Sequence, residues 1–257
     1  MKWMPELTLE QGQAKTVDSH LGPLTIQLKG EALHYSHPDF KKPESEKPIS
    51  KIFLMESLGE RVNLTFRPLY PDRPIVFKLE DSLSIPPGED GFFVLTMPVA
   101  VGMEIQRTET ILEELLPKPR KQTYWGPPQD GLLAYEVRST ISTDALERTV
   151  STDTATAVVP VWFRNRYEEM HEIKRCLVPI QELDLYRNDE DDLVFEVVSL
   201  VQQEEFYQEP KPLKRPPKEM KQRLNHYLTA PNQAQTLFER VKGLPRLDHI
   251  TSVFMNR

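Results

Sequence analysis

The segment Tyr124-Trp125-Gly126-Pro127-Pro128 contains the residue types best suited to contact with a partner. Tyr and Trp on a proline-stiffened loop offer flat apolar area at low entropic cost, which suits a protein or a sugar. Farther along the chain, Arg164-Asn165-Arg166 forms a polar turn that can add hydrogen bonds. The candidate binding residues are therefore Tyr124, Trp125, Arg164 and Asn165. The alternative is a structural turn whose Trp packs on a sheet.

The sequence predicts no metal site, no cofactor and no catalytic centre. His34 and His37 are three residues apart, so on a strand they point to opposite faces and converge poorly on a metal. The acidic run at 189–192 lacks the ligand spacing of an EF-hand loop, and it suits a solvated turn. Cys176 lies in an apolar strand, where a buried, unreactive thiol is expected. The chain has no G-x-S-x-G motif.

A basic segment follows an acidic body. The net charge is −7, but residues 211–257 hold ten Lys and Arg against three Asp and Glu, while residues 1–210 hold 22 against 36. The acidic body disfavours nucleic acid, because it repels phosphates. The basic tail can bind an acidic partner or fold back on its own body, and both interpretations stay open. Its clustered cations are Lys211, Lys214, Arg215, Lys218, Lys221 and Arg223.

The elements that must position these residues are mostly β-strands. Apolar and polar side chains alternate at 24–28, 62–66 and 133–137, which is the period of a strand. The 23 prolines, against 10 glycines, disfavour helices and separate the apolar runs. Residues 1–21 are polar, and we expect them to form a loose lead-in without strands. The pattern predicts an all-β fold of the β-sandwich type.

The chain is predicted to have three parts. Residues 1–107 form an N-terminal β domain and 108–209 a second β-sandwich domain, so that two sandwiches in tandem are an alternative to one. Residues 210–257 form a basic linker and a short C-terminal α-helical segment. Apolar residues at helical spacing in 218–228, and again from Asn232 to Val241, indicate two amphipathic helices. We expect these helices to dock on the chain itself or on another protein subunit.

The expected location is the cytoplasm. A single cysteine excludes an internal disulfide framework, and the first residues contain no apolar leader segment. The longest uncharged apolar stretch, Phe92 to Met103, is too short to span a bilayer and is interrupted by Pro98. No membrane span is therefore expected.

Five short motifs occur in a distinctive order over roughly residues 20–205. They are Gly22-Pro23-Leu24, Pro98-Val99-Ala100-Val101-Gly102, Tyr124-x-Gly126-Pro127-Pro128-x-x-Gly131, Phe163-Arg164-Asn165, and Val178-Pro179-Ile180 ahead of Leu183-Asp184-Leu185-Tyr186. In this order they resemble an uncharacterised prokaryotic family, a domain of unknown function that is well represented in archaea. The resemblance implies a β-rich fold and brings no activity, cofactor or catalytic residue.

The sequence thus predicts a non-catalytic β-sandwich module that binds an unidentified partner. The expected partner is a protein rather than nucleic acid. Two other functions stay open. One is a hydrolase acting on sugars or esters, since the many Asp and Glu residues allow carboxylate pairs. The other is nucleic-acid contact through the basic tail.

Overall fold

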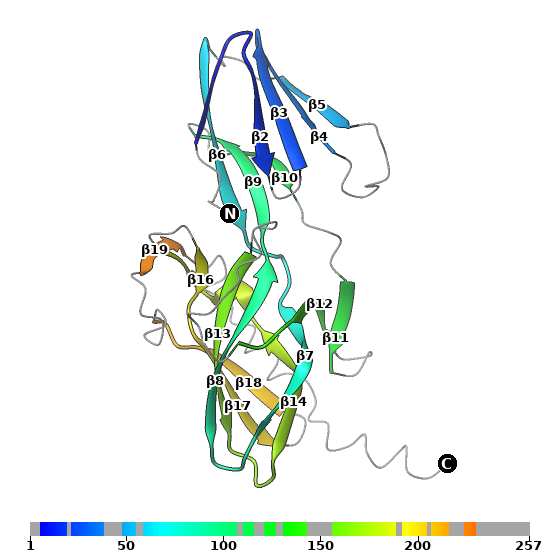
Figure 1. Cartoon of the computed structure of the whole chain (residues 1–257), viewed down its shortest axis with the longest axis vertical. Coiled ribbons are helices and arrows are strands. Elements are labelled where there is room, and N and C mark those ends of the chain that lie inside the picture. Colours follow the sequence, from blue (N-terminus) through cyan, green and yellow to red (C-terminus); the bar gives the residue numbers. More distant parts are fainter. Residues whose placement is uncertain are drawn as a thin grey trace, which may run out of the picture. The chain divides into compact units, whose positions relative to one another are not determined.

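The structure, a computed structural model of the 257-residue chain, is almost entirely β-strand where it is described (Figure 1). The described residues are 6–19, 22–38, 48–54, 59–106, 110–115, 121–126, 131–142, 156–188, 192–204, 207–215 and 224–229. The prediction of an all-β protein is confirmed. The chain divides into two compact units, each with its own sheets.

The two units do not follow one another along the chain. Unit 1 takes residues 1–70, 98–119 and 149–156, and unit 2 takes residues 71–97, 120–148 and 157–257. The domain boundary that the sequence suggests at residue 107 therefore does not match a boundary of either unit. The reason is long-range pairing: the chain leaves unit 1 after β6 and returns to it to pair β9 with β6.

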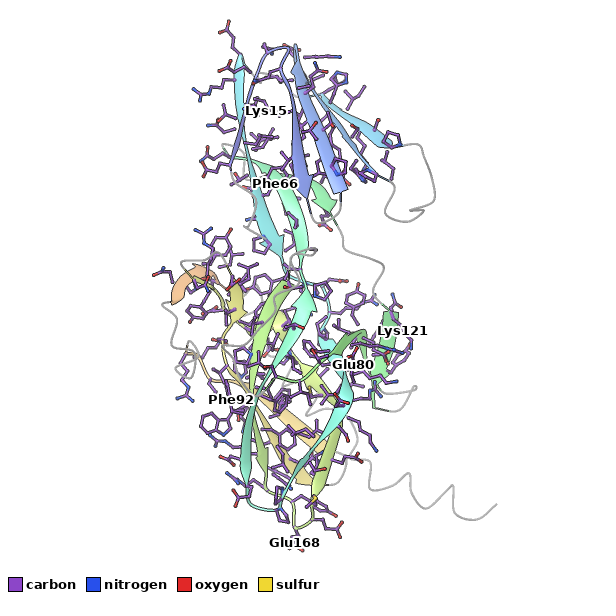
Figure 2. All side chains as sticks on the ribbon, viewed as in Figure 1. Lys15, Phe66, Glu80, Phe92, Lys121 and Glu168 are labelled. Carbon is purple, nitrogen blue, oxygen red and sulfur yellow. The ribbon has the colours of Figure 1, made fainter. Side chains whose placement is uncertain are left out.

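Unit 1 contains two four-stranded antiparallel sheets. The β6 sheet has the order β1-β6-β9-β10, and the β3 sheet has the order β2-β3-β4-β5. The strands are β1 (Leu7–Glu10), β2 (Ala14–Ser19), β3 (Gly22–Lys29), β4 (Ala32–His37), β5 (Ile49–Leu54), β6 (Arg61–Leu69), β9 (Ala100–Ile105) and β10 (Thr110–Leu115). Both sheets contribute to one core, which includes Ile26, Tyr35 and Phe66 (Figure 2). The predicted alternation at 24–28 and 62–66 is confirmed, but β1 and β2 replace the predicted loose lead-in.

Unit 2 contains two mixed sheets. The β7 sheet has the order β11-β12-β7-β14, and the β13 sheet has the order β18-β17-β13-β16-β15-β19, with β8 also paired to β13. The elements are β7 (Ile75–Ile85), β8 (Asp90–Pro98), β11 (Lys121–Trp125), β12 (Leu132–Ser139), β13 (Thr156–Asn165), β14 (His171–Val178), the 3-10 helix η1 (Ile180–Glu182), β15 (Leu185–Asn188), β16 (Leu193–Phe195), β17 (Val198–Glu204), β18 (Tyr207–Pro212) and β19 (Leu224–Leu228).

Contacts between β13 and the β7 sheet join the two sheets of unit 2. The Phe163 ring on β13 stacks on His171 of β14, with ring centroids 5.6 Å apart. Two residues farther, the Asn165 side chain donates to the carbonyl of Ile85 at the end of β7. Val161, Phe163 and Asn165 are all buried, so this side of β13 faces the interior of unit 2.

The predicted C-terminal helix is wrong over the residues that the structure describes. Residues 224–228 form β19, which pairs antiparallel with β15. A short helix gains little from propensity alone, whereas pairing with a strand edge satisfies the backbone of both partners. Residues 218–223 and the second predicted helix, from Asn232 to Val241, lie outside the described residues.

Candidate binding face around Trp162

The alternation of β13 sends two functional side chains outward. Val161, Phe163 and Asn165 are buried, whereas Trp162 and Arg164 between them are partly exposed. In a strand, residues two apart share one face of the sheet. Trp162 and Arg164 therefore stand together on the outer side of the β13 sheet. Asn165, although a neighbour of Arg164, points the other way.

One carboxylate organises this surface. Asp90, the first residue of β8, accepts a hydrogen bond from Trp162 Nε1 at 3.1 Å and one from Arg166 at 2.7 Å. Arg164 Nε lies 3.8 Å from the same carboxylate. Arg166 also donates to the carbonyl of Gly88 at 2.9 Å. Asp90 thus fixes the indole edge and two guanidinium groups at once.

Two arginines lie over the Trp162 ring. The Cζ atom of Arg164 is 5.9 Å from the ring centroid, and that of Arg215 is 6.0 Å away. Phe92 on β8, labelled in Figure 2, is also part of this surface. Its ring meets the indole edge to face, with centroids 6.4 Å apart. A guanidinium within about 6 Å of an indole is attracted by the ring quadrupole. We call this surface the Trp162 face: Asp90, Phe92, Trp162, Arg164, Arg166 and Arg215.

The Trp162 face has more positive than negative charge. It contains three guanidinium groups and one carboxylate, that of Asp90, which pairs with Arg164 and Arg166. Among the described residues, Arg215 has no carboxylate partner, and its Nε is buried without a hydrogen bond. Arginine and tryptophan are the side chains most often found at the energetic centres of protein interfaces. The face is therefore equipped to bind an anionic group beside an aromatic one.

An ion pair between the half-exposed Lys214 and the buried Glu196 holds the segment that carries Arg215. The backbone of 213–215 is tied to Val197 by two hydrogen bonds, Leu213 N to Val197 O at 3.0 Å and Val197 N to Arg215 O at 3.4 Å. Lys214 has a φ of 52°, in the left-handed region. Its Nζ donates to the carbonyl of Glu182 at 3.2 Å and lies 3.7 Å from Glu196 Oε1. Lys214 thus reaches inward while Arg215 lies on Trp162.

Glu196 is a buried acid in an unusual environment. Its side chain is 0% exposed, and neither carboxylate oxygen has a hydrogen-bond partner within the described part of the chain. Burial, helped by the like charge of Asp184, raises the pKa of Glu196 to about 7, although Lys214 opposes the shift. Burial and the same two acids also raise the pKa of Tyr186. His226 completes the cluster, 3.8 Å from Asp184.

Asn165 stabilises the turns beside the Trp162 face. Its Nδ2 donates to the carbonyls of Ile85, at 2.9 Å, and Glu169, at 2.8 Å, and its Oδ1 accepts from the backbone N–H of Tyr167 at 3.0 Å. The side chain is 0% exposed. It braces the start of the connection between β13 and β14, whose tip carries Glu168 (Figure 2). In this structure it therefore holds the scaffold rather than facing a ligand.

Tyr124 and Trp125 lie in a different sheet from Arg164. Trp125 packs with Leu132 against the buried residues Val76, Ala134 and Leu177 of the β7 sheet. Its cationic neighbour is Arg175, whose Cζ is 5.9 Å from the ring centroid. The structural alternative for Trp125, a Trp packed on a sheet, describes this arrangement. Tyr124 is 46% exposed, and a contact role for it stays a prediction.

The first residues of the predicted basic tail belong to β18 and to the turn that follows it. Lys211 belongs to β18, and Lys214 and Arg215 form the turn that follows it, so the predicted linker is wrong at these positions. Lys214 binds in cis to the acidic body through Glu196. Lys218, Lys221 and Arg223 lie outside the described residues.

The other residues that the sequence analysis considered are His34, His37, Cys176 and the acidic run at 189–192. His34 is partly exposed and His37 is buried, in keeping with opposite faces of β4. Burial raises the pKa of the Cys176 thiol to about 12. Asp192 closes a turn with Asn188, while 189–191 are outside the described residues. Within the described ranges, no three His, Cys, Asp or Glu side chains are placed to hold a metal ion.

Sequence reasoning named Arg164 and, in the basic tail, Arg215 as candidates, but it missed Trp162, Asp90 and Glu196. Trp162, Arg164 and Arg166 are spaced two apart, and on a strand this spacing places an aromatic and cations on one face. The sequence therefore contains a signal for the aromatic and cationic part of this face. Asp90 is 72 residues from Trp162, and no local pattern connects the two.

Comparison with curated proteins and with solved structures finds no match for this chain. No helix in the described residues has the length and apolar character needed to cross a membrane. A family described as a protein of unknown function, DUF432, matches residues 6–241. This match confirms the resemblance to a domain of unknown function, and it covers most of the chain. The protein belongs to the DUF432 family.

Proposed function

We propose that this protein is a non-catalytic β-sandwich interaction module whose contact surface is the Trp162 face. The observation that carries the proposal is the excess of guanidinium groups around one partly exposed indole. Interfaces concentrate their binding energy in such Trp and Arg side chains. The Asp90 contacts hold Trp162 and Arg166 in place before any partner arrives, which lowers the entropic cost of binding.

The environment of Glu196 favours binding over hydrolysis. A general acid with a pKa near 7 suits glycoside hydrolysis, but it must reach the substrate. The Glu196 side chain has no exposed surface, and its neighbour in space, Lys214, holds the turn that follows β18. The cluster around Glu196 therefore serves better as a structural support than as a reaction centre.

Two features favour a protein partner over nucleic acid. The chain has a net charge of −7, which repels the dense, continuous charge of a polyphosphate more than the few carboxylates of a protein segment. Single-stranded nucleic acid also needs open aromatic faces for stacking, whereas guanidinium groups already lie over the Trp162 ring. The expected location remains the cytoplasm, where we propose that the partner is met.

A site-specific photo-crosslink tests this function. Phe92 is replaced by benzoylphenylalanine in the full chain, and the protein is irradiated in an extract of its source organism. Ile52, an exposed side chain in unit 1, is the matched control position. We expect a discrete crosslinked protein from position 92 that is absent from position 52 and is lost when Trp162→Ala is added.

Two results would contradict the proposal. One is a crosslink at position 92 that persists unchanged in the Trp162→Ala chain, or no crosslink at all. The other is turnover of nitrophenyl glycosides or esters by the purified chain that is lost in Glu196→Gln, which would establish the hydrolase alternative instead.

A further inference from the structure

We infer that the Trp162 face recognises an acidic segment of a protein partner, whose carboxylates pair with Arg215 and Arg164. This inference rests on the proposed function and adds the chemistry of the partner. It starts from the charge of the face, which contains three guanidinium groups but one carboxylate, that of Asp90, paired with Arg164 and Arg166. Among the described residues, the Arg215 guanidinium makes one cation–π contact, and this contact is with the Trp162 ring.

Asp90 shows how the face holds a carboxylate. Its two oxygens are divided between the indole and the guanidinium groups: Oδ2 accepts from Trp162 Nε1 at 3.1 Å and Oδ1 accepts from Arg166 at 2.7 Å. Both are strong geometries for a charged acceptor. The Nε of Arg164, at 3.8 Å from Oδ2, is beyond hydrogen-bonding distance and is buried, but 40% of the Arg164 side chain is exposed. Arg164 therefore retains donor capacity for a second carboxylate.

The Arg215 guanidinium is held ready by the interior of unit 2. Lys214, its neighbour in the chain, is anchored by Glu196 and by the carbonyl of Glu182. Both backbone hydrogen bonds to Val197 fix the same turn. This arginine has a backbone held by hydrogen bonds and a guanidinium that already contacts the Trp162 ring. It therefore loses less conformational entropy when it binds an anion. Affinity should therefore depend on Arg215 as well as on Arg164.

The ring arrangement favours carboxylates on a peptide rather than phosphates on a nucleic acid. A guanidinium fork matches a carboxylate in two parallel hydrogen bonds, and the indole and Phe92 add apolar area for the side chains beside it. Stretches of alternating acidic and apolar residues present both groups. A nucleic acid would bring the same anionic charge but needs a free ring face for its bases.

The test uses fluorescence anisotropy with the full chain and three labelled probes. The first is a 12-residue peptide that alternates Asp or Glu with Leu or Tyr, the second is the same peptide with Asn and Gln in place of the acids, and the third is a dT12 oligonucleotide. The variants are Arg215→Gln, Arg164→Gln and Arg215→Lys. The control is Arg61→Gln, which removes an exposed arginine of β6 in unit 1.

We expect the acidic peptide to bind and the amide peptide not to bind. Arg215→Gln and Arg164→Gln should each weaken binding about ten-fold, the loss of one charge-assisted contact, and Arg61→Gln less than two-fold. Arg215→Lys, which keeps the charge without the fork, should lie between wild type and Arg215→Gln.

Three results would overturn the inference: no binding of the acidic peptide, equal loss in Arg61→Gln and Arg215→Gln, or tighter binding of dT12 than of the peptide. The photo-crosslink separates this failure from that of the function. If position 92 still captures a protein in a Trp162-dependent way, the interaction module stands and only the acidic chemistry of its partner is rejected.

Discussion

The Nζ atom of Lys214 lies 3.7 Å from Oε1 of Glu196, a side chain with no exposed surface. This ion pair joins the turn after β18 to the interior of unit 2. Because Arg215 follows Lys214 and lies over Trp162, the pair also supports the outer surface of the β13 sheet. Because Glu196 is buried and Lys214 is 57% exposed, removing the lysine leaves a buried acid without its cation.

Replacing Glu196 with Gln should remove a pH dependence of stability. Its pKa rises from an ordinary value of 4.5 to about 7 in the folded chain, chiefly by burial. Between these values the unfolded chain releases a proton that the folded chain keeps, so stability falls as the pH rises from about 4.5 to about 7 and is level above that. The loss should be about 3 kcal/mol, at roughly 1.4 kcal/mol for each pKa unit.

Urea unfolding at several pH values checks this prediction. Other groups near Glu196 are Asp184, Tyr186, Lys214 and, through Asp184, His226. Subtracting the Glu196→Gln profile from that of wild type cancels their contributions, apart from their direct coupling to Glu196. Glu80→Gln, at an exposed position of β7, is the matched control and should leave the profile unchanged. Identical profiles for wild type and Glu196→Gln would show that Glu196 does not titrate in this window.

Removing Lys214 should destabilise the protein and weaken the Trp162 face together. Lys214→Met leaves Glu196 without its cation, and because Glu196 can then take up a proton, the loss at pH 8 should be about 1 kcal/mol, at roughly 1.4 kcal/mol for each pH unit above the pKa of about 7. The loss should be largest at pH 8 and small at pH 4.5, where Glu196 is protonated. Adding Glu196→Gln should recover most of the stability. If Lys214→Met is equally destabilising at both pH values, the ion pair is not the cause.

Asn165 should matter for stability and not for affinity. Asn165→Ala leaves two backbone carbonyls and one N–H without their buried partner, at a cost of about 2–4 kcal/mol. Asn63→Ala, at an exposed position of β6, should cost less than about 1 kcal/mol. Thermal unfolding measures both changes. A loss of peptide affinity in folded Asn165→Ala, with stability retained, would instead make Asn165 a contact residue.

Cys176 should be unreactive until the chain unfolds. Burial raises the pKa of its thiol to about 12, so very little thiolate exists at pH 8. Iodoacetamide should therefore label the protein only in urea, with the same midpoint as unfolding followed by circular dichroism. Fast labelling of the native protein at pH 8 would show that the β14 region opens without global unfolding.

Strand alternation predicted much of the fold, and long-range pairing explains where it failed. Leu24, Ile26 and Leu28 all point into the core, as their period indicates. Leu224 to Leu228 has helical spacing of its apolar residues, yet it pairs with β15, which lies far back in the sequence. The apolar pattern of β1 is too short to recognise, since it rests on Leu7 and Leu9 alone.

The candidate site could be predicted in part for a similar reason. Arg164 and Arg166 belong to a strand end rich in polar residues, and with Trp162 their spacing indicates one shared face. The residue type of Asn165 indicates a contact role, but the same strand alternation places its side chain in the interior. Asp90 and Arg215 reach Trp162 from β8 and from the turn after β18, so tertiary structure alone brings them together.

The most direct measurement is the fluorescence of Trp162 in a chain where Trp3 and Trp125 are changed to Phe. On titration with the acidic peptide, we predict a saturable change in emission whose midpoint matches the anisotropy curve and moves to higher concentration in Arg215→Gln. The same titration with the amide peptide should show no change, and a chain that keeps Trp125 beside Trp162 should show no change beyond that of Trp162 alone. Binding that leaves Trp162 emission constant, or alters that of Trp125 instead, would contradict the assignment of the contact surface to the Trp162 face.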